Sequence, residues 1–497
     1  MISRYIQPII SAVWLPETRV AAWDDVETAA VRASERLGIV PQRTAERIGD
    51  ILRENPLDLD AWDALEKLMH HDLGAYVRLR QDLLPPELAP FFHDGMTSYD
   101  TEDPAFARAL LDCCSVVSLK MIDLLSSLAR AARLYRFTPT LVRTHGQWAK
   151  LATFGGTILT WYAELQTAYY LFLPAVNECR KSRLSGAVGN YGGGLSPETE
   201  RVALAELHFE PYPGATQIMT RVVYAHLAQT LANIMSALEN MALAFRLGAR
   251  SGYTLWQEFF GLAQVGSSAM PQKRNPIIAE QVAGMARMAR TKAAAIAENI
   301  VTWERRDISQ SCVERVEWPD LFHILVHTIT RVTRLVDGMM VYPQTMRQEI
   351  VASRGTYAAD EAKNFLAKHL GAQGIPAKTA YGILQLACFD EFAAAFAEVA
   401  PPRSLEEAQG LFDLLLVLPI CHTSPQSIEF RIRDARLEVN PKLAADANTV
   451  AEWNALLRTT FTKPGVREAW KNLFTFEYLL RQEQSLFERL LGDAPAS

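Results

Sequence analysis

The sequence has 497 residues, of which 49% are hydrophobic and 21% are charged, and its formal net charge is −6. This balance is typical of a globular protein with a large buried core. The negative charge excludes a general attraction to nucleic acid or to acidic membranes, so any anion-binding site must be local.

The cysteines and the first residues indicate a cytoplasmic protein. None of the six cysteines is spaced as CxxC, so they predict reduced thiols rather than disulfides or zinc ligands. The opening "MISRYIQPIISAVWLPETR" interrupts its apolar stretch with polar residues and a proline, unlike a signal peptide. No run of about eighteen apolar residues occurs, so we expect no membrane span.

The hydrophobic pattern is helical along most of the chain, and strand-like alternation is nearly absent. Apolar residues recur every three or four positions in five long segments, which predict helices over about 106–132, 157–172, 223–245, 278–300 and 321–339. Five such helices can lie side by side in one bundle. The sequence therefore predicts an all-α fold.

Three helical domains are expected. Shorter helices fill 1–105, the long bundle spans 106–350, and 351–497 forms a C-terminal domain of short helices. The C-terminal domain is broken by "GAQGIPAK" (371–378) and by "APPRS" (400–404).

Four polar segments interrupt the apolar rhythm and are the candidates for function. They are "HHDLGAYVR" (70–78), "HDGMTSYD" (93–100), "RTHGQWA" (143–149) and "GSSAMPQKRNP" (266–276). A lone histidine is usually structural and a Gly-Ser-Ser loop is usually a linker. In the last segment, however, the loop precedes a helix that begins near Pro276, so its amides can converge on an anion. Lys273 and Asn275 add donors suited to a carboxylate.

The last segment resembles the GSSxMPxKxNP signature of the fumarase/aspartase superfamily at every fixed position. Within it, the chain resembles the adenylosuccinate lyase family from residue 1 to about 343. The segments "RYIQPIISAVW", "HDLGAYVR", "GMTSYD", "RTHGQWA", "SGAVGNY" and "ERRDISQSCVER" follow in the expected order. The resemblance implies a three-domain fold with a long central bundle that assembles into a homotetramer with shared active sites.

The resemblance also implies the chemistry. Family members cleave a C–N or C–O bond β to a carboxylate and release fumarate. Ser267 would be the general base, while Lys273 would stabilise the charge that develops on the carboxylate. His145 would be the general acid, and Glu280 would orient it. The alternative for Glu280 is an acid favoured by the helix dipole.

The resemblance assigns substrate contacts to two further sets of residues. The phosphate ligands would be Arg4, Tyr5, Arg306, Ser311 and Arg315. The remaining substrate-binding residues would be His71, Asp72, His93, Thr97, Ser98, Thr144, Gln217, Ser268, Met270 and Asn275. Guanidinium groups with a hydroxyl suit a phosphate dianion.

The sequence thus predicts an enzyme that cleaves adenylosuccinate to AMP and fumarate, and also succinyl-aminoimidazole carboxamide ribotide, without a metal or organic cofactor. Gln272 stands where the family often has histidine. Such departures leave open a superfamily lyase for another N-succinyl compound. A catalytically inactive structural bundle is the alternative of another class. The leaving amine, the pathway and the order of product release are not encoded in these motifs.

Overall fold

The structure is a computed structural model that describes residues 1–261, 263–395 and 447–493. The proposed break at 400–404 and the segment "FRIRDARLEVNP" (430–441) lie outside the described residues. The chain divides into two compact units. The first comprises Met1–Ser127, Trp161–Leu247 and Glu258–Gly338, and the second comprises Leu128–Thr160, Gly248–Gln257 and Met339–Ser497. The three predicted domain boundaries remain a prediction.

The first unit begins with a layer of shorter helices. They are η1 (Ser3–Tyr5), α1 (Pro8–Val13), α2 (Pro16–Arg36), α3 (Thr44–Glu54), α4 (Leu59–Met69) and α5 (Asp72–Leu83). Trp23 of α2 is fully buried and contacts the rings of Trp62 and Tyr76, with centroids 5.7 and 5.0 Å away. Aromatic pairs of this geometry stabilise a core beyond the area they bury. They fix α4 and α5 against α2.

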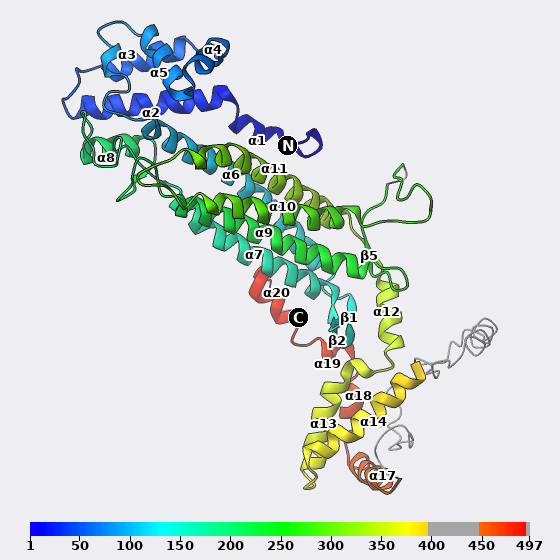
Figure 1. Cartoon of the computed structure of the whole chain (residues 1–497). Helices are drawn as coiled ribbons and strands as arrows, with labels where there is room; N and C mark the ends of the chain where they lie inside the picture. The colour runs from blue at the N-terminus through cyan, green and yellow to red at the C-terminus, as the bar shows by residue number, and fades with distance from the viewer. Residues whose placement is uncertain (262, 396–446, 494–497) are drawn as a thin grey trace. The chain divides into compact units, whose positions relative to one another are not determined.

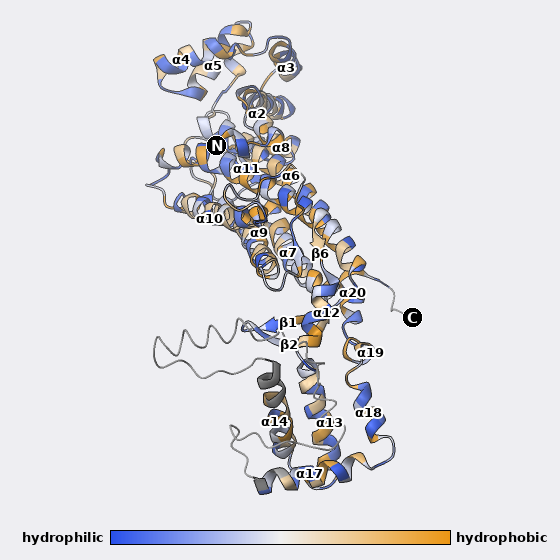
Figure 2. Ribbon diagram, turned by 90° about the vertical axis from the view of Figure 1, so that its right-hand side faces the viewer, coloured by the Kyte–Doolittle hydropathy of each residue, from blue (hydrophilic) through white to orange (hydrophobic). Residues whose placement is uncertain are grey.

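All five predicted long helices are confirmed. They are α6 (Ser98–Leu134), α7 (Phe154–Glu178), α9 (Arg221–Gly248), α10 (Ile277–Glu298) and α11 (Ser309–Gly338), and they lie side by side in a bundle (Figure 1). Apolar and polar residues alternate along them at helical spacing, as the hydropathy colouring shows (Figure 2). Such stripes pack bundle helices against one another. The short α8 (Pro197–Glu206) and the two-residue strands β3 (Lys181–Ser182) and β4 (Glu210–Pro211) join α7 to α9.

Helices α10 and α11 form an antiparallel pair. At one end, the side-chain amide of Asn299 donates to the carbonyl of Gln310. At the other end, Gly338 lies against Phe259, which precedes α10. With 22 residues, α10 is about 33 Å long at about 1.5 Å per residue. Residues before α10 and residues at the start of α11 therefore lie at opposite ends of the pair.

The second unit contains a β-hairpin that the sequence analysis did not predict. Strands β1 (Pro139–Thr144) and β2 (Gln147–Thr153) pair antiparallel, with Leu141 opposite Leu151. Both leucines are buried and form a small core with Ile350. The remaining elements of this unit are β5 (Trp256–Gln257), β6 (Met340–Val341), α12 (Pro343–Ala352), η3 (Thr356–Ala358), α13 (Ala359–Gly371), α14 (Ala377–Ala395), α17 (Ala447–Phe461), α18 (Val466–Asn472), α19 (Phe476–Leu479) and α20 (Gln484–Leu491). Within the described ranges, every helix is too short or too polar to cross a membrane.

A buried ion cluster ties three bundle helices together. Arg221 of α9 donates to both carboxylate oxygens of Glu314 on α11, at 2.8 and 3.1 Å, and to Asp103 on α6 at 2.9 Å. All three side chains are buried. Removing one partner from a buried ion cluster leaves charge without compensation.

We expect Arg221→Met to lower the free energy of unfolding by about 3–5 kcal/mol, because Glu314 and Asp103 would stay buried without a cation. Urea unfolding followed by circular dichroism measures this. The matched control is Arg201→Met, which removes an arginine from an exposed ion pair with Glu198 and should leave the midpoint unchanged. An unchanged midpoint in Arg221→Met would contradict the structural role of the cluster.

Candidate active site

The signature segment 266–276 forms a loop with its own hydrogen bonds. The Ser267 hydroxyl oxygen accepts the backbone amides of Ala269 and Met270, at 3.4 and 3.2 Å. The Asn275 side-chain amide donates to the carbonyl of Gly266 at 2.9 Å and closes the loop at its base. Amide donors directed at an oxygen favour its negatively charged form. The loop thus supplies Ser267 with a local environment that suits a base.

Gly266 is required by close packing. A β-carbon at this position would overlap the backbone carbonyl oxygen of Lys273. The two backbone segments of the loop can approach only because residue 266 lacks a side chain. Ser268, Met270 and Lys273 are exposed on this loop, and Ser267 is half-buried.

Helix α10 starts at Ile277, directly after the loop, as predicted. Its first amides are not free to bind an anion, however. The buried Glu258 carboxylate accepts the amides of Ile278 and Ala279, at 3.0 and 2.8 Å. Burial raises the pKa of Glu258, and these two amides lower it. The first turn of α10 is therefore occupied by Glu258, and the anion site expected at the amides of the 266–268 loop remains a prediction. Glu280 is an exposed acid in the first turn.

A second group of predicted residues gathers at the other end of the bundle. His71 caps α5, because its Nδ1 accepts the amide of Gly74 at 2.9 Å. The ring proton is therefore on Nε2, which lies 3.3 Å from the Ser98 hydroxyl. Asp72 pairs with Arg315 at 2.6 Å. The structure thus brings together residues from the 70–78, 93–100 and 304–315 segments.

His93 lies in the same end of the first unit. Its Nδ1 is 2.8 Å from the Glu27 carboxylate, which also accepts the Thr101 hydroxyl at 2.6 Å. Burial lowers the pKa of His93, but the Glu27 carboxylate outweighs it and raises the pKa above its usual value. Glu27 is fully buried. Among the described residues, only His93 offers it a group that can be a cation at hydrogen-bond distance. The Glu27 carboxylate therefore favours the protonated form of His93.

Asp100 joins the 93–100 segment to the "SGAVGNY" segment. Its carboxylate accepts the amides of Thr97 and Gly186, at 2.8 and 3.1 Å, and pairs with the buried Arg183 at 2.9 Å. This holds the Thr97 backbone, next to Ser98, in a fixed position. Gly95 lies against Gly193 so closely that a β-carbon there would overlap its carbonyl.

Gln217 bridges two further predicted segments. Its amide nitrogen donates to the carbonyl of Ala187 at 2.9 Å, and its amide oxygen accepts the Arg306 guanidinium at 3.0 Å. The same guanidinium lies 3.9 Å above the Tyr99 ring, a favourable cation–π distance. Gln217 and Arg306 are thus held together.

A cavity of about 320 Å³ lies beside this group. Ser311 and Arg315, two of the predicted phosphate ligands, line it together with Arg19, Tyr99 and Glu102. Ser311 is buried. A hydroxyl between guanidinium groups is the kind of site that binds a phosphate dianion.

Arg4 and Tyr5 do not lie at this cavity. The Tyr5 ring contacts His327 with centroids 5.1 Å apart, and the backbone amide of Gln7 donates to His323 at 3.0 Å. Along α11, His327 is about 24 Å beyond Ser311 at about 1.5 Å per residue. One chain therefore does not unite the five predicted phosphate ligands.

His145 lies at the tip of the β1–β2 hairpin in the second unit. It and Gly146 form the two-residue turn. Their φ angles are 53° and 75°, so both residues have left-handed backbone. Thr144 and His145 are exposed. Arg143 anchors the hairpin by pairing with Glu349 and by lying 4.8 Å over the Tyr253 ring.

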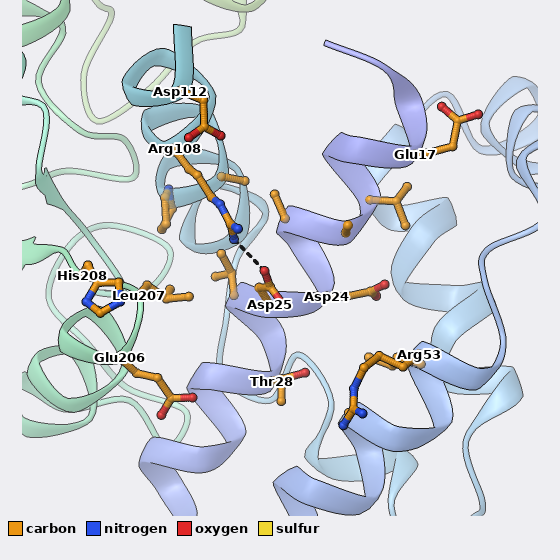
Figure 3. Close-up of a pocket in the computed structure, with 18 of the residues that line it drawn as sticks. Glu17, Asp24, Asp25, Thr28, Arg53, Arg108, Asp112, Glu206, Leu207 and His208 are labelled. Carbon is orange, nitrogen blue, oxygen red and sulfur yellow. Dashed lines mark hydrogen bonds and ion pairs between the residues drawn. The ribbon is translucent and has the colours of Figure 1, made fainter. Parts of the chain in front are cut away.

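A larger cavity of the first unit, about 780 Å³, lies elsewhere (Figure 3). None of the predicted site residues lines it. Its charges pair with each other: Arg108 with Asp25 at 2.6 Å, Arg80 with Asp24 at 2.6 Å, and Arg32 with Glu206. Size alone therefore does not mark the active site in this chain.

The sequence analysis did not single out four charged residues that hold or line the candidate site: Glu27, Arg183, Glu258 and Arg19. Glu27 stands within the apolar run "VETAAV", and Arg183 is completely buried. A charge in an otherwise apolar stretch costs free energy unless it is paired, so it signals a specific partner. That signal was present for Glu27.

Known proteins resemble this chain over most of its length. A family model described as lyase matches residues 24–291. The adenylosuccinate lyase of Thermotoga maritima is 32% identical over 423 residues, 83% of this chain and 96% of that protein. That of Synechocystis sp. is 30% identical over the same shares.

Solved structures share the fold. The fumarate lyase from Mesorhizobium sp. BNC1 has a TM-score of 0.75 at 19% identity, covering 99% of this chain and 100% of that chain. The β-carboxy-cis,cis-muconate cycloisomerase of Acinetobacter calcoaceticus has a TM-score of 0.70 at 17% identity, covering 98% of each chain. The chain therefore belongs to the lyase family of the fumarase/aspartase superfamily. Within it, the chain is similar to the adenylosuccinate lyases, which confirms the predicted fumarate-releasing carbon–nitrogen lyase.

We expect Gly266→Ala to lower kcat for fumarate release by about 100-fold, because the added methyl would displace Lys273 and the Ser267 turn. The melting temperature should change little, since the loop is mostly exposed. Absorbance at the fumarate band and thermal unfolding test both statements. Gly284→Ala, within α10 at a position where an added β-carbon would meet no atom within 4 Å, is the control. Wild-type turnover in Gly266→Ala would contradict the close packing of this loop.

Proposed function

We propose that the enzyme cleaves adenylosuccinate to AMP and fumarate, and that it also acts on succinyl-aminoimidazole carboxamide ribotide. The observation that carries this proposal is the group of Gln217, Arg306, Ser311 and Arg315 at one end of the bundle. It offers a hydroxyl and two guanidinium groups to a phosphate. The similarity to adenylosuccinate lyases supports the same substrate.

The first chemical step would be removal of a proton from the succinyl carbon next to a carboxylate. The ionised oxygen of Ser267 takes this proton and becomes a hydroxyl, and the C–H electrons move toward the carboxylate. Lys273, Asn275 and the loop amides would stabilise the resulting charge. The two amides directed at the Ser267 oxygen support this role, because a serine is a base only when its ionised form is favoured.

The second step would break the C–N bond. The bond electrons pass to the amine nitrogen, which takes a proton from His145, and fumarate and AMP leave. An imidazole can carry that proton near neutral pH. Glu280 would orient the ring. Thr97, Ser98 and Thr144 would bind the succinyl carboxylates, while His71, His93, Asp72 and Gln217 would shape the pocket.

The active site would be shared between subunits of a homotetramer. Within one chain, the Ser267 loop and the Arg306–Arg315 group lie at opposite ends of α10 and α11, about 33 Å apart. A nucleotide cannot span that distance. Exposed apolar residues on the bundle helices, such as Leu119, Leu171 and Leu243, support burial against other subunits. A cytoplasmic location, without nucleic acid or membrane partners, belongs to the same proposal.

The decisive experiment is an absorbance assay of the purified protein with adenylosuccinate beside a panel of other N-substituted aspartates. Turnover of adenylosuccinate, with stoichiometric AMP and fumarate, is the expected result. Turnover of another N-succinyl compound alone would replace the substrate but keep the elimination. Absence of fumarate from every compound would favour a structural bundle.

We expect Ser267→Ala to lower kcat at least about 1,000-fold with little change in substrate affinity, because the base would be lost while the binding residues stay. Single-turnover measurements and equilibrium binding of adenylosuccinate separate the two effects. Ser485→Ala, on α20 in the second unit, is the control for a serine hydroxyl outside the site. Near-normal turnover would remove Ser267 as the base.

Sharing of sites makes a further expectation testable. Ser267→Ala and Arg306→Ala chains should each be inactive, but mixed tetramers should regain up to about a quarter of wild-type activity, because some sites then draw both intact residues from different chains. Activity after mixing and reassembly measures this. A mixture as inactive as its components would show that both residues of a site come from one chain.

A further inference from the structure

The cavity beside the proposed phosphate ligands is lined by an acid, and phosphate binding in this cavity does not explain why an acid is there. Glu102, on α6, lines the same cavity of about 320 Å³ as Arg19, Ser311 and Arg315. It is one helical turn beyond Ser98, so the two side chains point from the same face of α6. A carboxylate in a cavity that binds a phosphate would repel it.

Charged groups from five helices surround Glu102. They are Arg19 from α2, Asp72 from α5, Asp103 from α6, Arg221 from α9, and Glu314 and Arg315 from α11. Arg221 pairs with Asp103 and Glu314, and this cluster carries one surplus negative charge. Asp72 pairs with both Arg315, at 2.6 Å, and Arg19, at 3.5 Å.

Arg19, Arg315 and Asp72 together carry one positive charge, which the surplus negative charge of the Arg221 cluster offsets. Arg19 is held in place, since its guanidinium lies 4.5 Å over the Trp23 ring and 5.0 Å over the Trp62 ring. The guanidinium groups of Arg19 and Arg315 therefore attract an anion most strongly while Glu102 is neutral. When Glu102 is ionised, it adds one negative charge to a lining whose other charges balance.

Glu102 is placed to change its charge near neutral pH. Among the described residues, no hydrogen bond or ion pair holds its carboxyl group. Burial and, to a smaller extent, the Asp72 carboxylate raise its pKa to about 7, against the lowering effect of Arg19. The second pKa of a phosphate monoester is about 6. A phosphate dianion and a neutral Glu102 therefore coexist mainly between about pH 6 and pH 7.

We infer that Glu102 is a specificity-determining residue of this cavity, which takes up a proton when a dianion binds between Arg19, Ser311 and Arg315. This inference rests on the proposed function, because it assigns the substrate's phosphate to this cavity. Binding would proceed with one proton added to the Glu102 carboxylate. Anion affinity would then fall as the pH rises above the pKa of Glu102, by up to about tenfold per pH unit.

Sulfate is the probe that isolates this effect, since it stays a dianion throughout the range. Its dissociation constant is measured on the assembled protein by calorimetry between pH 6 and pH 8.5, in buffers with different ionisation enthalpies to report proton uptake. We expect wild-type affinity to weaken about tenfold between pH 7.5 and pH 8.5, with up to one proton taken up. Glu102→Gln should bind sulfate with pH-independent affinity and no proton uptake.

Two variants locate the probe. Arg315→Gln should lose sulfate binding, and Asp112→Asn, which changes an acid of the same helix outside this cavity, should keep the wild-type pH dependence. Binding that survives Arg315→Gln, or a pH dependence that survives Glu102→Gln, would overturn the inference.

The proposed function can fail separately. If adenylosuccinate is not cleaved but sulfate behaves as described, the inference holds and the substrate assignment falls. If adenylosuccinate is cleaved but sulfate binding does not depend on Glu102, only the inference falls.

A measurement without ligand provides a second readout. A buried acid with a raised pKa destabilises the folded chain as the pH rises from about 4.5 to about 7, because the folded state then holds the extra proton. Glu102→Gln should therefore raise the melting temperature by about 2 °C at pH 8 and leave it unchanged at pH 5. Equal shifts at both pH values would contradict the ionisation of Glu102 in the folded protein.

Discussion

The antiparallel pairing of α10 with α11 is the constraint on which the arrangement of the site depends. Because the two helices run in opposite directions, the signature loop before α10 and the arginine-rich start of α11 are kept about a helix length apart. Packing of the apolar stripes makes this separation rigid. Under the proposed function, the chain holds two half-sites, and each would find its complement in another copy.

Each half-site is fixed by buried charge rather than by the loops themselves. Asp100 and Arg183 are both fully buried and hold the 93–100 segment against Gly186. Glu258 holds the first turn of α10 beneath the signature loop. Buried charges require nearly ideal partners, so each of them admits few alternative backbone positions. This is how exposed loops can present their side chains in a defined geometry.

The long helices and the segments of the site could be predicted from sequence, but their connections could not. The stripes of α9, α10 and α11 continue for more than five turns, and such periodicity has no other explanation than a helix packed on one face. The β1–β2 hairpin has too few alternating residues, and its turn uses His145 rather than asparagine before Gly146. The end of the bundle at which each motif lies depends on how the long helices pair. No local sequence pattern determines that pairing.

The sequence also could not predict that carboxylates of the same chain pair with the groups expected to bind the substrate. Glu258 already occupies the start of α10, and Asp72 already occupies Arg315. Burying a cation costs free energy unless an anion pairs with it, so the arginines of the candidate site are paired with carboxylates of the same chain, whose net charge is negative. A substrate anion would then compete with these carboxylates for the arginines. Its affinity would reflect the difference in free energy between the arginine–carboxylate pair and the arginine–ligand pair. Affinity in such a site is tuned by the internal acids as much as by the arginines, because each acid sets how much positive charge the ligand encounters.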